Sequence, residues 1–234
     1  MQSTKGKGYK KRFSSWYDKN LVISKGEKRL SEIDGIAIQL LRGHQLIWQS
    51  WSIFKPYFNP LGPSFPHHSA RSIEFARPSD LHRFFLSIAW RAAVSKLPDM
   101  REAVVEDEYL ELLRQAILDT SDLSPEFFPI GLNQISTKGT VHNQTPYTDR
   151  MPNPPFAPDL YDESATMLRV YFDGLVAHIH LNPKAEYARD NLAFIGGSKN
   201  MVVSAVTYEA SFQYENLLFV AAETHGPIIH NWKP

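Results

Sequence analysis

The sequence contains no cysteine among its 234 residues. This absence excludes disulfide bonds, zinc sites with thiolate ligands and cysteine nucleophiles. The sequence also contains no apolar run approaching the roughly 18 residues of a membrane-spanning helix, and its N-terminal segment has no apolar signal core. We therefore expect a cytoplasmic protein without a membrane segment.

Two motifs of common enzyme classes are also missing. No glycine-rich phosphate loop is present, because the Gly-Lys-Gly near residue 6 follows no predicted strand and lacks a Lys-Ser/Thr ending. No Gly-x-Ser-x-Gly nucleophile turn occurs either. The composition of the whole chain, 43% hydrophobic and 21% charged, is typical of a soluble globular protein with a substantial core.

Charge is balanced over the whole chain but unevenly distributed. Residues 1–30 contain nine Lys or Arg and only two Asp or Glu. A basic arm of this kind is typical of a nucleic-acid contact, although a solvated start with no binding role is the alternative. The residues that we expect to make such a contact are Lys5, Lys7, Lys10, Lys11 and Arg12.

After this arm, residues 1–16, apolar periodicity predicts a helical region over residues 17–120. Its clearest element is a helix at 79–96, where Leu81, Phe84, Phe85 and Ile88 recur at helical spacing. Further helices are expected at 27–41 and 99–120, with a short strand at 21–23, a turn at 25–26 and a proline-punctuated connection within 44–78.

The second half of the chain has a different pattern. Residues 121–160 are rich in proline and predict a long connection between two regions. Within 161–234, strands are expected at 167–172 and 175–181, joined by a turn at Asp173-Gly174, and also at 192–195, 201–206 and 217–221. The predicted fold class is α+β, in which a helical N-terminal part precedes a mostly antiparallel sheet.

Two segments carry a family resemblance. The first contains Tyr17, Asp18, Leu21 and Val22, followed by a helix with Glu27, Leu30, Asp34 and Ala37, and the second is Phe-Leu-Ser-Ile-Ala-Trp-Arg-Ala at residues 85–92. In this order they resemble an HNH-like family of bacterial and phage proteins that begin with a zinc-bound module.

The departures from this family decide what the resemblance implies. Ile23 and Gly26 stand where the family has a Cys-x-x-Cys, and the residues upstream supply no zinc ligands. The resemblance therefore implies a degenerate member whose lost zinc site is offset by apolar packing, and no catalytic residue of the family can be carried over.

Histidines offer an independent candidate for a metal site. His178 and His180 alternate along a predicted strand, so their side chains should point to the same face of the sheet. With His225 or His230 they could provide three imidazole ligands for zinc or another divalent ion. The alternative is that they are ordinary polar positions on a half-exposed strand.

Three further features have both a functional and a structural interpretation. The pair His67-His68 is similar to the start of some HNH nucleases, but it could equally lie in a surface loop. Arg91, beside Trp90, could contact phosphate or make a structural hydrogen bond. The aromatic residues of 44–90 could stack on unpaired bases or build the core.

We therefore expect a non-catalytic binding or regulatory protein related to HNH-like nucleases, with no cofactor, acting on nucleic acid or a partner protein in conflict between phage and host. The competing hypothesis is a metal-dependent nuclease with a histidine-based site. A third is that the chain is a fragment of a longer zinc-containing protein. Oligomeric state is left open.

Overall fold

The computed structural model describes residues 21–51, 62–63, 66–139, 145–151, 165–215 and 217–218, and the backbone of residues 2–3 and 9–10. Its helices are α1 (Ser24–Gly43), α2 (Pro78–Val94) and α3 (Asp107–Leu118), with short 3-10 helices η1 (Trp48–Ser50), η2 (Pro98–Met100), η3 (Glu186–Ala188) and η4 (Tyr208–Ala210). Its strands are β1 (Gln2–Ser3), β2 (Tyr9–Lys10), β3 (His68–Glu74), β4 (Ile130–Ile135), β5 (Tyr147–Arg150), β6 (Thr166–Phe172), β7 (Leu175–His180) and β8 (Asn200–Val206).

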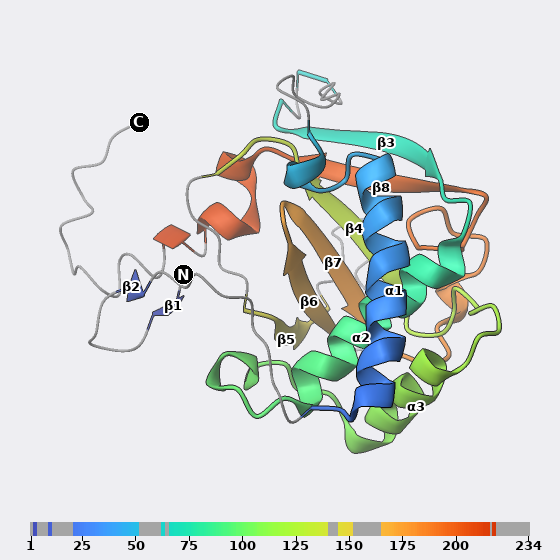
Figure 1. Cartoon of the computed structure of the whole chain (residues 1–234). Helices are drawn as coiled ribbons and strands as arrows, with labels where there is room; N and C mark the ends of the chain where they lie inside the picture. The colour runs from blue at the N-terminus through green and yellow to red at the C-terminus, as the bar shows by residue number, and fades with distance from the viewer. Residues whose placement is uncertain are drawn as a thin grey trace.

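Strands β3 to β8 form one six-stranded sheet in the order β3-β8-β4-β7-β6-β5. All neighbours are antiparallel except β4 and β8, which run parallel. Strands β1 and β2 pair separately. The three helices lie in front of the sheet in Figure 1. The prediction of an α+β protein with a mostly antiparallel sheet is confirmed.

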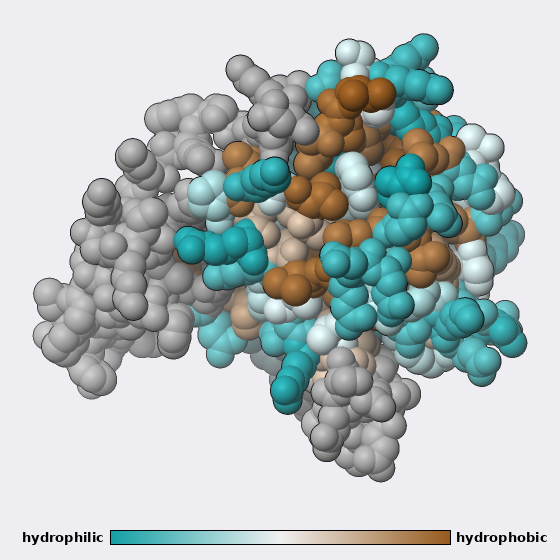
Figure 2. Space-filling model, turned by 90° about the horizontal axis from the view of Figure 1, so that it is seen from below, coloured by the Kyte–Doolittle hydropathy of each residue, from teal (hydrophilic) through white to brown (hydrophobic). Residues whose placement is uncertain are grey.

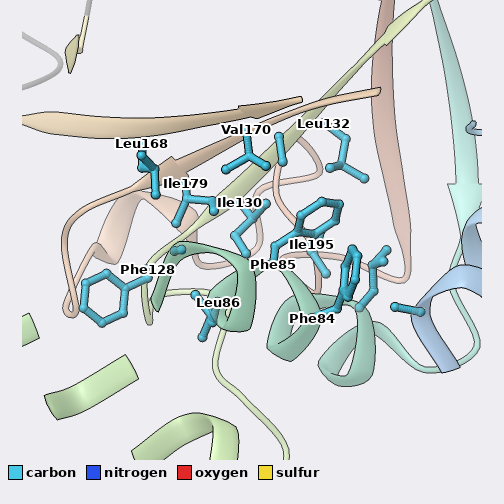
Figure 3. Packing of buried hydrophobic residues seen from close by; sticks show 14 of the residues in the cluster. Phe84, Phe85, Leu86, Phe128, Ile130, Leu132, Leu168, Val170, Ile179 and Ile195 are labelled. Atoms are coloured by element: carbon cyan, nitrogen blue, oxygen red, sulfur yellow. The ribbon is translucent and has the colours of Figure 1, made fainter. Parts of the chain in front are cut away.

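Helix α2 packs directly on the sheet. Pro78 occupies its first turn, where a missing N–H costs no helical hydrogen bond, and Asp80 lies in the same turn beside the positive end of the helix dipole. Side chains from α2 and from strands β4, β6 and β7 interdigitate (Figure 3). The buried members include Phe84, Phe85, Leu86, Leu132, Leu168, Val170 and Ile179. The helix predicted at 79–96 is therefore the element on which the core is built.

Arginine side chains join the three helices. Arg91 of α2 makes two hydrogen bonds, 2.9 and 2.8 Å long, to the carboxylate of Asp34 in α1. Near the C-terminus of α3, Arg29 donates to the carbonyl of Ile117 and Arg83 to that of Ala116, each at 3.0 Å. Cations at the end of a helix satisfy its last carbonyls and complement its dipole, so these contacts stabilise the helical layer.

A smaller cluster lies on the opposite face of the sheet. Trp48 of η1 donates from its indole N–H to the carbonyl of Ile135 at 2.8 Å, and its backbone N–H donates to Asp173 at 2.8 Å. Val176 and Tyr208 pack beside it. The β6–β7 turn, with Gly174 at a φ of +84°, is thereby held against η1.

Several local predictions are wrong. Residues 121–160 are not only a connection, because β4 lies in the middle of the sheet and β5 at its edge, and β3 lies within 44–78. Residues 21–22 are bends, Ile23 is the extended residue that precedes α1, and 25–26 belong to α1. Residues 192–195 form turns with one isolated bridge, between Phe194 and Gly131. Of the strand predicted at 217–221, Leu217 and Leu218 are helical and residues 219–221 lie outside the described residues. The sequence leaves open whether the two predicted regions are separate domains, and the core takes residues from both, from Leu30 to Val203.

Candidate functional site

The face of the sheet opposite the helices carries a row of polar and aromatic side chains. Cross-strand register places Tyr147 of β5 opposite Arg169 of β6, Arg169 opposite His178 of β7, and His178 opposite Gly131 of β4. Directly paired residues present their side chains on the same face. We call Tyr147, Arg169, His178 and the neighbouring Phe212 the Arg169 cluster.

Arg169 is the charged centre of this cluster. Its side chain is only 8% exposed, and its guanidinium carbon lies 4.9 Å from the ring centre of Tyr147 and 4.2 Å from that of Phe212. Its Nε donates to Nε2 of His178 at 3.3 Å. Burial lowers the pKa of Arg169, although a guanidinium stays charged at neutral pH. The cation therefore lies against two aromatic faces and an imidazole.

No carboxylate among the described residues forms an ion pair with Arg169. Its Nη1 is buried and has no hydrogen-bond partner there. The hydroxyl of Tyr147, the cross-strand neighbour, is likewise buried and unpaired, and so is Oδ1 of Asn133 on the same face of β4. A buried charge is costly without a counter-charge, and unsatisfied buried polar groups are rare enough that each needs an explanation, such as a bound ion or ligand.

The two strand histidines are held neutral. Burial, followed by the charges of Arg169 and His180, lowers the pKa of His178 to about 3. Burial lowers the pKa of His180 to about 4. Nδ1 of His180 lies 2.9 Å from the hydroxyl of Tyr187, and its ring meets that of Phe194 edge-on at 5.1 Å.

The residues predicted for a metal site are only partly brought together. His178 and His180 do point to the same face of β7, but the residues that the structure describes contain no group of three His, Asp or Glu side chains that could hold a metal. His225 and His230 lie outside the described residues. In addition, the Nε2 lone pair of His178 accepts from Arg169, whose charge repels a cation. The described residues therefore do not fit a metal ion.

The predicted nucleic-acid contacts lie in the basic arm. Only the backbone of Lys10 is described there, and Lys5, Lys7, Lys11 and Arg12 lie outside the described residues. Of the two roles considered for Arg91, the structure shows the structural one, because its guanidinium pairs with the carboxylate of Asp34. This contact joins the two segments that carry the family resemblance. His67 and His68 are exposed at the start of β3, where His67 meets the hydroxyl of Thr207 at 3.4 Å.

An apolar surface offers no comparable site. Figure 2 shows apolar side chains gathered between polar ones on the underside of the molecule. Large exposed apolar side chains in the described chain include Ile23 at 77% and Val104 at 63% exposure. Nothing among the described residues identifies what would cover them.

Sequence reasoning missed Arg169, Tyr147 and Phe212. The signal for Arg169 was present, because a two-residue turn at Asp173-Gly174 pairs residues equally distant from it, and Arg169 and His178 are both four residues away. No comparable signal places Tyr147 or Phe212, which reach the cluster from β5 and from the helical turn at 212–215.

Comparison with protein-family models, with curated proteins and with solved structures finds no match for this chain. In the part of the chain that is described, no helix is long and apolar enough to cross a membrane.

Proposed function

We propose that this chain is a non-catalytic binding or regulatory protein, a degenerate relative of the HNH-like family, that contacts nucleic acid or a partner protein through the Arg169 cluster. The observation that carries the proposal is that Arg169 is only 8% exposed and that its guanidinium has aromatic neighbours but no carboxylate partner among the described residues. An anionic group on the ligand would supply a counter-charge that the described residues do not provide.

The surroundings of the histidines favour binding over metal-dependent hydrolysis. A nuclease of the HNH type needs a metal beside the scissile phosphate and a base that activates water. His178 accepts a hydrogen bond from a cation, and His180 contacts the hydroxyl of Tyr187. With pKa values lowered to about 3 and about 4, both imidazoles are already neutral, so metal affinity would not be limited by protonation but by the neighbouring positive charge.

The test is cleavage of supercoiled plasmid and of single-stranded DNA by the full chain, with Mg²⁺, Mn²⁺ and Zn²⁺ supplied separately. We expect no cleavage, and no stoichiometric divalent metal in the purified protein. Metal-dependent cleavage that disappears in His178→Ala or His180→Ala, but persists in His68→Ala at an exposed position, would overturn the proposal and establish a histidine-based nuclease site.

A further inference from the structure

We propose that the Arg169 cluster binds a nucleotide of single-stranded nucleic acid, with Arg169 contacting the phosphate and Phe212 stacking on the base. This inference rests on the proposed function and names its ligand class. It depends on the described side chains of the sheet face and not on the basic arm.

The polar half of the site consists of donors. Among the described residues, the buried Nη1 of Arg169 and the buried hydroxyl of Tyr147, opposite it in the sheet, have no hydrogen-bond partner. Because Nε2 of His178 accepts from Arg169, the proton of the neutral imidazole is assigned to Nδ1, which adds a third N–H or O–H donor to the cluster. A phosphate presents several acceptor oxygens and a negative charge, and therefore matches a guanidinium with neighbouring neutral donors.

The aromatic half of the site distinguishes a nucleotide from a simple carboxylate. Phe212 is 43% exposed although its ring lies against the guanidinium of Arg169 and stacks on Tyr147, with 5.9 Å between ring centres and 26° between planes. An acidic side chain could neutralise Arg169, but it has no flat apolar group to cover this exposed ring. A nucleic-acid base has such a flat face. Stacking of a base on an aromatic side chain beside arginine is a common mode of single-strand binding.

The strand must be single because duplex bases are already stacked on each other. Their faces become available to a protein side chain only where the strand is unpaired. The site therefore predicts weak dependence on base identity, since every base has a face that can stack and the donors of the cluster are aimed at phosphate.

The experiment measures fluorescence anisotropy of labelled oligo(dT) and oligo(rU) with the full chain. EDTA is present, so that no divalent metal is available for cleavage of the oligonucleotides. Phe212→Leu keeps an apolar side chain and should weaken binding about tenfold. Arg169→Gln should reduce the slope of log affinity against log salt by about 0.7, the value for one phosphate on a single strand. Thermal unfolding of each variant checks that it is folded.

Two matched variants control for general effects. Arg42→Gln removes an exposed positive charge from α1, which lies on the other side of the sheet, and Leu192→Ala removes an apolar side chain that is 51% exposed. Both should bind as the unmodified chain does. Tyr147→Phe removes only the unpaired hydroxyl and should weaken binding less than Phe212→Leu.

Three results would overturn the inference. The first is absence of oligonucleotide binding by the unmodified chain, and the second is binding that Arg169→Gln and Phe212→Leu leave unchanged. The third is displacement of the oligonucleotide by poly-glutamate at equal charge concentration, which would assign the site to an acidic protein. Cleavage of the oligonucleotides when metal replaces EDTA would instead overturn the proposed function and leave this ligand class standing.

Discussion

A buried histidine of α2, His82, should make the stability of this protein fall in mild acid. His82 is 1% exposed, and its Nε2 lies 3.2 Å from the carbonyl of Phe128. Burial lowers its pKa from 6.5 to about 4, and this effect outweighs the backbone contacts that raise it. Between these values the unfolded chain binds a proton that the folded chain does not. Stability is therefore fully present above pH 6.5 and is lost as the pH falls toward 4.

The magnitude follows from the same two pKa values. Lowering the pH from about 7.5 to about 5 should cost about 2 kcal/mol of unfolding free energy through His82 alone. His178 and His180, with pKa values lowered to about 3 and about 4, contribute in the same direction. His82→Gln removes the titrating group and keeps a side-chain N–H that can donate to Phe128. The variant should therefore lose about 2 kcal/mol less than the unmodified chain over this interval.

The assay is equilibrium urea unfolding at a series of pH values between these limits, with the midpoint and slope fitted at each. His68→Gln, which replaces an exposed histidine of β3, is the matched control and should retain the pH dependence of the unmodified chain. If His82→Gln loses as much stability as the unmodified chain on acidification, the reasoning about this buried imidazole is refuted.

Three substitutions test the packing that positions the sheet. Gly174→Ala should destabilise the fold by about 3 kcal/mol or more, because φ is +84° and the new Cβ would lie 2.1 Å from the indole nitrogen of Trp48. Chemical unfolding measures this loss, and an unchanged midpoint would contradict the packing of Gly174 against Trp48. Trp48→Phe should cost about 2 kcal/mol in the same assay, because the buried carbonyl of Ile135 loses its donor. A double-mutant cycle of Arg91→Met and Asp34→Asn should give a coupling of about 1 kcal/mol, and additive effects would show that their contact contributes little.

The helices could be predicted from the sequence, and several strands could not. Helix α2 has a strong apolar period and a proline in its first turn, so local signals agree with the packing. In contrast, β3 has one buried hydrophobic residue, Ile73, and β4 lies between proline-containing segments that are typical of loops. Both strands form because neighbours distant in sequence pair with them, and a local pattern does not contain that information.

In the candidate site, too, one part could be predicted from the local pattern and another part could not. Alternation along β7 correctly places His178 and His180 on one face. The importance of Arg169 depends on what lies across from it and on Phe212, which is 43 residues further along the chain. A lone arginine in a strand is not distinctive until the structure shows that none of the described carboxylates pairs with it.

The position of β8 also limits the order in which this protein can fold. This strand lies between β3 and β4, yet it is the last strand in the described chain. During synthesis, β3 and β4 therefore cannot be joined in one sheet until residues 200–206, which pair with both of them, have left the ribosome. The six-stranded sheet on which α2 packs is therefore complete only after most of the chain has been synthesised. Chains truncated before Asn200 lack Met201 and Val203 of the core, so they should leave core side chains exposed and aggregate. Folding should be slow compared with that of a protein built from local contacts.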